Sequence, residues 1–210
     1  MMKIKLAAAA LLSLAHPALA QQAPPAGAPP RAAASHDPQA APTGAYRLDP
    51  RHASIIARVG HNGIAFSTYR FGGASGTLDW NGADPTKAHV DITVDMTSIE
   101  TPVPNFASEL IGDRFLKTAQ FHDAKFVSGA IRRTGPTSGV IDGMLTFMGQ
   151  TRPASIEAVM VGTGPGRNGQ VIGFSGKMRF KRSDFGFTTL MGVISDDVEV
   201  MIETEFDKIA

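Results

Sequence analysis

Four histidines between residues 46 and 210 are the side chains best suited to metal binding or acid–base chemistry: His52, His61, His89 and His122. Two imidazoles on one strand can share a metal ion when they are two positions apart, because alternate side chains lie on the same face. No two of the four have that spacing. His52 and His61 are an odd number of positions apart, so on a regular strand they face opposite ways unless a turn or bulge intervenes. Isolated strand histidines are more often hydrogen-bonded structural residues than ligands, and that alternative stands beside a ligand contact for both.

Motifs for nucleophilic or nucleotide chemistry are missing. The sequence has no cysteine, no Gly-x-Ser-x-Gly and no glycine-rich loop that ends in Gly-Lys-Ser/Thr. The stretch GPGRNG, residues 164–169, matches Gly-x-Gly-x-x-Gly, but it contains Pro165 and opens no helix, so we expect a hairpin loop. We therefore expect that the protein is not an enzyme and that it holds no cofactor. His61 is the one good candidate for an enzymatic alternative.

The stretch FKRSDFGFT, residues 180–188, combines charged and aromatic side chains beside a glycine. Asp184 could cap the local turn, and Arg182 could form an ion pair with it. Structural closure of one end of the fold and contact with a ligand explain this stretch equally well.

Alternation of apolar and polar residues is the dominant pattern of the elements that must position these side chains. AHVDITVDM (88–96) and VEVMIETEF (198–206) place apolar side chains on one face and polar ones on the other, as half-buried strands do. Similar runs separated by turn signals give eight or nine strands. One segment, residues 101–116, has helical spacing of Phe106, Leu110 and Phe115, with a start at Pro104-Asn105 and a stop at Gly112.

Small residues occur on the apolar sides of the predicted strands: Ala53, Ala57, Gly129, Gly143, Ala154, Ala158 and Gly176. A solid core favours bulkier side chains, so these positions indicate a cavity, which an eight-stranded barrel can enclose. The alternative is that they relieve crowding or form bulges.

The two ends of the chain differ in composition. Residues 1–20 have the pattern of a cleaved signal peptide: Lys3 and Lys5, an apolar run and Ala18-Leu19-Ala20. Residues 21–45 hold six prolines and nine alanines, which predicts a disordered linker. Residues 46–210 have the length of one domain. We expect a periplasmic protein with no membrane-spanning segment.

The charges indicate a mixed, solvated surface. Loss of Lys3 and Lys5 with the signal peptide leaves 18 basic and 19 acidic residues, and no basic block stands out. We therefore expect no nucleic-acid partner.

Five motifs in order resemble those of the YceI-like family, secreted bacterial lipocalin-like barrels that bind polyisoprenoids. They are Tyr46-x-Leu48-Asp49-x-x-His52, then Val59-x-His61-x-Gly63, then DGMLTFMGQTRP (142–153), FKRSDFGF (180–187) and ISDDVEVMIETEF (194–206). The chain departs from the family at Glu109, Arg114 and His122, where the family commonly has histidine, an acid and proline. The resemblance implies an all-β, eight-stranded antiparallel lipocalin-like barrel with a short helical insertion.

The resemblance also implies a ligand: an isoprenoid lipid, such as a prenyl quinone or prenyl phosphate, enclosed in the barrel. The aromatic and apolar residues expected to line its site are Phe66, Phe71, Phe106, Leu110, Phe115, Phe121, Met144, Phe147, Phe174 and Met178. His61 is the first candidate for a polar contact, followed by His52, Arg182 and Asp184, although His52 is better suited to bracing the first strand. A solid barrel that acts as an interaction domain is a third alternative, and a homodimer through edge strands is a candidate assembly.

Overall fold

The computed structural model of the chain describes residues 33–167 and 169–209. The signal peptide predicted at residues 1–20, and the predicted linker as far as residue 32, lie outside the described residues. Among the described residues, no helix has the length and apolar character needed to cross a membrane.

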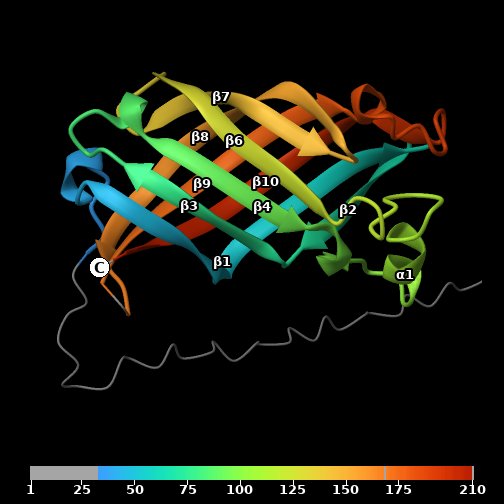
Figure 1. The fold of residues 1–210 in the computed structure, drawn as a ribbon, viewed down its shortest axis with the longest axis horizontal. Helices are drawn as coiled ribbons and strands as arrows, with labels where there is room; N and C mark the ends of the chain where they lie inside the picture. The colour runs from blue at the N-terminus through green and yellow to red at the C-terminus, as the bar shows by residue number, and fades with distance from the viewer. Residues whose placement is uncertain (1–32, 168, 210) are drawn as a thin grey trace, which may run out of the picture. The chain divides into compact units, whose positions relative to one another are not determined.

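Strands account for most of the described chain, with one short α-helix and four 3-10 helices (Figure 1). The strands are β1 (Gly44–His61), β2 (Ala65–Phe71), β3 (Ala74–Trp80), β4 (His89–Asp95), β5 (Ile99–Glu100), β6 (Asp123–Arg133), β7 (Ser138–Phe147), β8 (Gln150–Pro165), β9 (Gln170–Lys181) and β10 (Ile194–Lys208). The helices are η1 (Pro38–Ala40), η2 (Pro85–Lys87), η3 (Met96–Ser98), α1 (Phe106–Leu110) and η4 (Arg182–Phe185).

Eight of the strands close into an antiparallel barrel. Their order is β10-β9-β8-β7-β6-β4-β3-β1, and pairing of β10 with β1 completes the ring. The predicted all-β, eight-stranded antiparallel barrel with a short helical insertion is therefore confirmed. Closure pairs both edges of every barrel strand along part of its length, which leaves the two-residue β5 at the end of the sheet. Outside the ring, β2 pairs with β5 only at Arg70 and Phe71.

The first strand bends sharply because of a bulge near its start. Its first residues pair with β3 and its last seven with β2, while register against β10 shifts between Leu48 and Ala53. Pro50 lies in this gap and has no N–H to donate to the ladder. The carboxylate of Asp49 replaces the missing ladder bonds by accepting from the backbone N–H, Nε and Nη2 of Arg51 at 3.0, 3.0 and 2.7 Å.

Residues 33–45, which the sequence predicts as part of a disordered linker, instead pack on the barrel. Ser35 pairs with Thr163 of β8, and Trp80 Nε1 donates to the carbonyl oxygen of Pro38 at 3.3 Å. Ala41 is only 1% exposed. The low hydrophobicity of this segment does not prevent ordering, because its backbone groups find partners on strands distant in sequence.

The helical insertion is shorter than the predicted segment 101–116. α1 begins after Asn105, which has a left-handed φ of 65°, and spans five residues. Beyond Leu110 the chain continues in turns, in which Leu116 N–H donates to the carbonyl oxygen of Leu110 at 2.9 Å. Leu110, Phe115 and Leu116 are buried in the core, whereas residues 102–105 are exposed. Figure 1 shows α1 at one end of the barrel.

Candidate functional site

A cavity of about 550 Å³ runs along the inside of the barrel. Its lining extends from Pro38 and Trp80 near one end to His61, Leu190 and Val193 near the other. The volume falls in the usual range of about 300–1,000 Å³ for small-molecule sites. The barrel therefore encloses a cavity and is not completely filled by side chains.

Small inward residues create much of this space. Ala57, Ala158 and Gly176, from β1, β8 and β9, line the cavity. The other four small residues predicted to face inward do not line it: Ala53, Gly129, Gly143 and Ala154. A methyl group added at Gly176 would lie 3.1 Å from Cγ2 of Ile156, which is already a tight contact. Bulkier residues at these positions would fill the space, as the sequence pattern indicates.

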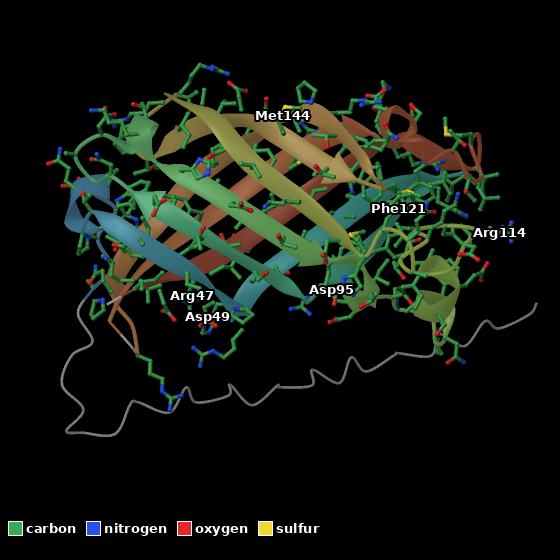
Figure 2. All side chains as sticks on the ribbon, in the orientation of Figure 1. Arg47, Asp49, Asp95, Arg114, Phe121 and Met144 are labelled. Carbon is green, nitrogen blue, oxygen red and sulfur yellow. The ribbon has the colours of Figure 1, made fainter. Side chains whose placement is uncertain are left out.

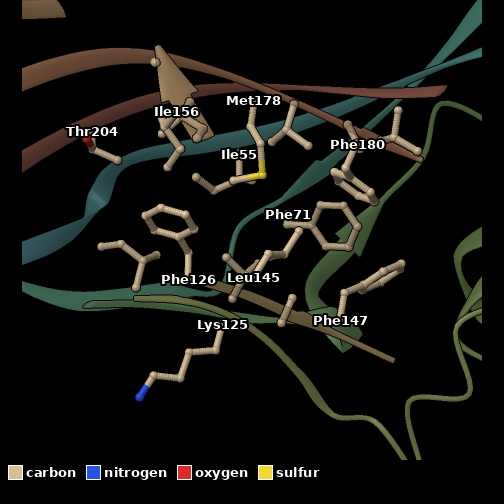
Figure 3. Close-up of a pocket in the computed structure, with 18 of the residues that line it drawn as sticks. Ile55, Phe71, Lys125, Phe126, Leu145, Phe147, Ile156, Met178, Phe180 and Thr204 are labelled. Carbon is tan, nitrogen blue, oxygen red and sulfur yellow. The ribbon is translucent and has the colours of Figure 1, made fainter. Parts of the chain in front are cut away.

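Aromatic side chains form two clusters along the cavity. Around the α1 end, the ring of Phe147 lies 5.9 Å from Phe180, 5.7 Å from Phe185 and 6.2 Å from Phe187, all edge-to-face. Figure 3 shows Phe147, Phe180 and Phe71 facing the same space as the thioether of Met178. At the other end, Trp80 packs 5.7 Å from Phe174.

Different segments of the chain lie at the two ends of the cavity. At the Trp80 end the 33–45 segment lies over the barrel, and Trp80 and Phe206 are buried. At the α1 end, His61, Leu190 and Val193 line the cavity and are also exposed to solvent. The Trp80 end is not fully closed either, because Arg133 and Pro136 at the β6–β7 turn line the cavity and are exposed. We refer to the α1 end, where His61, Leu190 and Val193 meet solvent, as the mouth of the cavity.

Arg182 holds together the loop that forms one side of this mouth. Its guanidinium donates to four backbone carbonyl oxygens, those of Phe187, Thr189, Ile194 and Ser195, at 2.7–3.0 Å. The side chain is only 2% exposed, and burial lowers the pKa of Arg182 from its ordinary value. The predicted ion pair with Asp184 does not form, because the guanidinium N–H groups point to these carbonyls.

Two of the other charged groups of the lining lie near acids, whereas Arg133, at the β6–β7 turn, donates to the carbonyl oxygen of Pro136 at 3.1 Å. Lys125 Nζ lies 2.9 Å from Asp91 Oδ2, and in Figure 3 its ammonium points away from the apolar side chains. Arg114 Nη1 lies 3.8 Å from Glu109 Oε1 at the mouth. The cavity itself is thus lined mainly by hydrocarbon, with its charges near the edges.

Nine of the fourteen residues predicted to contact a ligand line the cavity. They are His61, Phe71, Phe106, Leu110, Phe115, Phe147, Phe174, Met178 and Arg182. The apolar members come from strands of both halves of the barrel and from the α1 segment, which explains how positions far apart in sequence share one surface.

Phe66 and Met144 lie outside the cavity because of strand alternation. On β2 the lining side chains are Ser67, Tyr69 and Phe71, so Phe66 faces outward and is 61% exposed. On β7, Leu145 and Phe147 face inward, and Met144 lies on the outer surface (Figure 2). A regular strand cannot place neighbours of odd spacing on one face, so the sequence prediction is corrected at both positions.

Three further predicted residues also lie outside the lining. His52 Nδ1 is 2.9 Å from Asp49 Oδ2, so His52 braces the β1 bulge. Phe121 packs against the β7–β8 turn, where a Cβ added at Gly149 would meet its ring at 2.6 Å. Asp184 is exposed, and the carboxylate that binds Ser183 N–H and Oγ is that of Asp196.

Several lining residues were missed from the sequence: Tyr69, Trp80, Phe126, Leu145, Phe180 and Phe187. Phe180 is two positions from Met178 on β9, so alternation alone would have placed both on the inner face. Strand alternation therefore predicts the inward direction of the strand residues. It does not predict that of Phe187, because Phe187 lies in the loop that Arg182 holds.

A cluster of ionisable groups lies outside the cavity, at the start of β6. His122 Nδ1 is 2.8 Å from Asp123 Oδ1, and His122 Nε2 is 3.7 Å from Asp95 Oδ1. The hydrogen bond to Asp123 and the charge of Asp95 raise the pKa of His122. Asp95 also accepts from the backbone N–H and hydroxyl of Thr97, which lowers its pKa.

Comparison with known proteins shows the family of this chain. The model of the YceI-like domain matches residues 46–206. This chain belongs to the YceI-like family. A UPF0312 protein of Shewanella oneidensis is 34% identical over 171 residues, which cover 80% of this chain and 90% of that protein.

Solved structures of YceI-like proteins share the barrel. The Campylobacter jejuni YceI protein is 27% identical with a TM-score of 0.62, covering 70% of this chain and 88% of that one. Burkholderia cenocepacia BcnA has a TM-score of 0.67 at 19% identity, over 75% of this chain and 98% of that one. A polyisoprenoid-binding domain from Saccharophagus degradans has a TM-score of 0.59 at 14% identity, over 80% of this chain and all of that one.

Proposed function

We propose that this YceI-like protein binds a polyisoprenoid lipid inside its barrel and serves as a periplasmic carrier or store. The observation that carries the proposal is the cavity of about 550 Å³, whose walls are apolar from the Trp80 end to the mouth. The family match covers the same barrel, and the Saccharophagus degradans neighbour is described as polyisoprenoid-binding. These findings support a lipid as the ligand.

The physical chemistry of such a cavity favours a long hydrocarbon chain. Each buried methylene contributes about 0.8 kcal/mol, so binding strengthens with the length of chain enclosed. Ordering a flexible chain offsets part of this gain, and a preformed cavity limits the additional cost of reshaping the protein. The aromatic rings of Phe71, Phe147 and Phe180 provide rigid walls for the methyl-branched units of an isoprenoid.

The unequal ends of the cavity indicate how the lipid lies. The tail points toward the covered end at Trp80, and the polar head group, a quinone or a phosphate, lies at the mouth beside His61. A polar head there keeps its contact with water, which a site deep in the hydrocarbon lining would remove.

Binding, rather than catalysis, is the role we propose for the cavity. Arg182 donates to four carbonyl oxygens, Lys125 lies beside Asp91 and Arg114 lies near Glu109, so these groups have structural tasks. The periplasmic location rests on the signal-peptide pattern of residues 1–20.

The first test is to identify what copurifies. The full chain is expressed with its own leader and isolated without detergent, and native mass spectrometry is followed by organic extraction. We expect a stoichiometric isoprenoid whose mass identifies head group and chain length. A folded protein that carries no lipid, and that also refuses added quinones and prenyl phosphates, would contradict the proposal.

A matched pair of variants on β8 tests the cavity directly. Ala158→Phe adds a ring on the inner face, and Glu157→Phe adds the same ring to the exposed face one position earlier. Binding of geranylgeraniol is followed by fluorescence of Trp80, the only tryptophan of the chain and part of the lining. We expect Ala158→Phe to weaken binding about tenfold or more, because the ring displaces several lipid carbons, and Glu157→Phe to leave it unchanged. Equal binding by both variants would place the ligand outside the barrel.

A further inference from the structure

Exposed apolar side chains gather around the mouth of the barrel. The β1–β2 hairpin presents Ile64 and Phe66, which are 88% and 61% exposed. The loop before β10 presents Leu190, Met191 and Val193, which are also exposed. We call these five residues the apolar rim. Asn62 N–H donates to the carbonyl oxygen of Val193 at 2.7 Å, so the two loops are joined, and both lie at the α1 end in Figure 1.

The apolar rim continues into the cavity without a break. Leu190 and Val193 are exposed on the outside and also line the cavity, as does His61 at the end of β1. A hydrocarbon chain entering the barrel would therefore pass from the rim to the lining while remaining against apolar side chains.

The two loops carry no formal charge. Residues 60–67 and 188–194 contain no aspartate, glutamate, lysine or arginine. The guanidinium of Arg58 lies 3.5 Å above the ring centre of Phe66, and its Nη1 is 3.4 Å from Glu199 Oε1, so this cation already has an acidic partner. Uncharged apolar loop tips of this kind suit insertion among lipid tails at a bilayer surface.

We propose that the apolar rim docks the barrel mouth onto the surface of a lipid bilayer, so that the ligand passes between membrane and cavity without crossing water. The inference rests on the proposed function, because a polyisoprenoid resides in membranes. A bilayer is favoured over a protein partner because two adjoining uncharged loop tips form one side of an opening that leads to a hydrocarbon lining, and Arg114 and Glu109 at the same mouth lie near each other. Since the rim lacks charge, docking should occur on zwitterionic lipid and persist at high salt.

The test compares two double variants of the full chain. Ile64→Ser with Met191→Ser removes two exposed rim side chains that do not line the cavity. Val159→Ser with Val161→Ser removes two exposed valines from β8, as a control. Cosedimentation with phosphatidylcholine vesicles measures docking, circular dichroism checks the fold, and uptake of geranylgeraniol from cyclodextrin measures cavity binding without a membrane.

We expect the wild type and the β8 variant to cosediment equally with vesicles. The vesicle partition coefficient of the rim variant should be lower by about tenfold or more. Three outcomes would overturn the proposal: no cosedimentation of the wild type, an equal loss in the β8 variant, or binding that requires anionic lipid and disappears at high salt. A dimer that the rim variant dissociates, with unchanged vesicle binding, would assign the rim to a second copy instead. Failure of all three proteins to take up geranylgeraniol would count against the lipid-binding function, while the vesicle result would still decide docking.

Discussion

Replacing Arg182 by methionine should release the loop that forms one side of the cavity mouth. The guanidinium is buried and donates to the carbonyl oxygens of Phe187, Thr189, Ile194 and Ser195. Methionine has similar length but donates nothing, so four carbonyl oxygens would lose their partner at once.

The size of the effect follows from these four bonds. Hydrogen bonds from a charged donor contribute about 1.5–3 kcal/mol each, which gives roughly 6–12 kcal/mol before any compensation. The loop is partly exposed, so water would reach some of the carbonyls, and methionine avoids burial of a charge. We therefore expect Arg182→Met to lower the free energy of unfolding by about 3–5 kcal/mol, a large share of the roughly 5–15 kcal/mol typical of a domain.

Urea denaturation followed by circular dichroism measures this loss. Arg182→Lys keeps the charge but offers three donors and no planar fork, so it should fall between the wild type and methionine. Lys181→Met is the neighbouring control, because its ammonium is exposed and its ion pair with Asp197 should contribute little to stability. A loss under about 1 kcal/mol for Arg182→Met would refute the view that the guanidinium holds the loop.

Two other changes test the surroundings of the barrel. Asp123 and Asp95 raise the pKa of His122 above its ordinary 6.5, so its stabilising effect is full below that pH and is lost as pH rises through the raised value. His122→Gln should therefore destabilise the protein at about pH 5.5 but not at about pH 8.5 in urea titrations, and an equal effect at both would contradict the assignment. Ala41→Asp, which buries a carboxylate at a position of the 33–45 segment that is only 1% exposed, should cost about 2–4 kcal/mol in thermal or urea unfolding, whereas Ala40→Asp next to it is exposed and should cost little.

Strand alternation predicts the barrel and also the face of each strand residue. The regular pattern from Val90 to Met96, and from Val198 to Phe206, is enough to identify half-buried strands and the direction each face takes. The chemical type of Phe66 and Met144 favours an inward position, but each is an odd number of positions from Phe71 or Phe147 on the same strand, so the two members of each pair lie on opposite faces. Parity decides the face of a strand residue, and hydrophobicity alone does not.

Features that depend on distant partners could not be obtained from the sequence. The two residues of β5 form a strand only because β2 pairs with them. The 33–45 segment is ordered by contacts with Trp80 and Thr163, which its own composition does not indicate. The sequence predicts an ion pair between Arg182 and Asp184, two positions away. In the fold, the Arg182 guanidinium donates to backbone carbonyl oxygens of the loop instead, and Asp184 stays exposed to water.

The pairing of β1 with β10 has a consequence for how the protein folds. The strand at residues 44–61 must find its partner at 194–208, across most of the chain, before the ring can close. Contacts of such long sequence separation form slowly, because the chain loses conformational entropy before the new contacts contribute any stabilising free energy. The barrel cannot close, and its cavity cannot exist, until the last strand has been synthesised. Until then the apolar inner faces stay open to solvent, and the nascent chain depends on late closure or on chaperones to avoid aggregation.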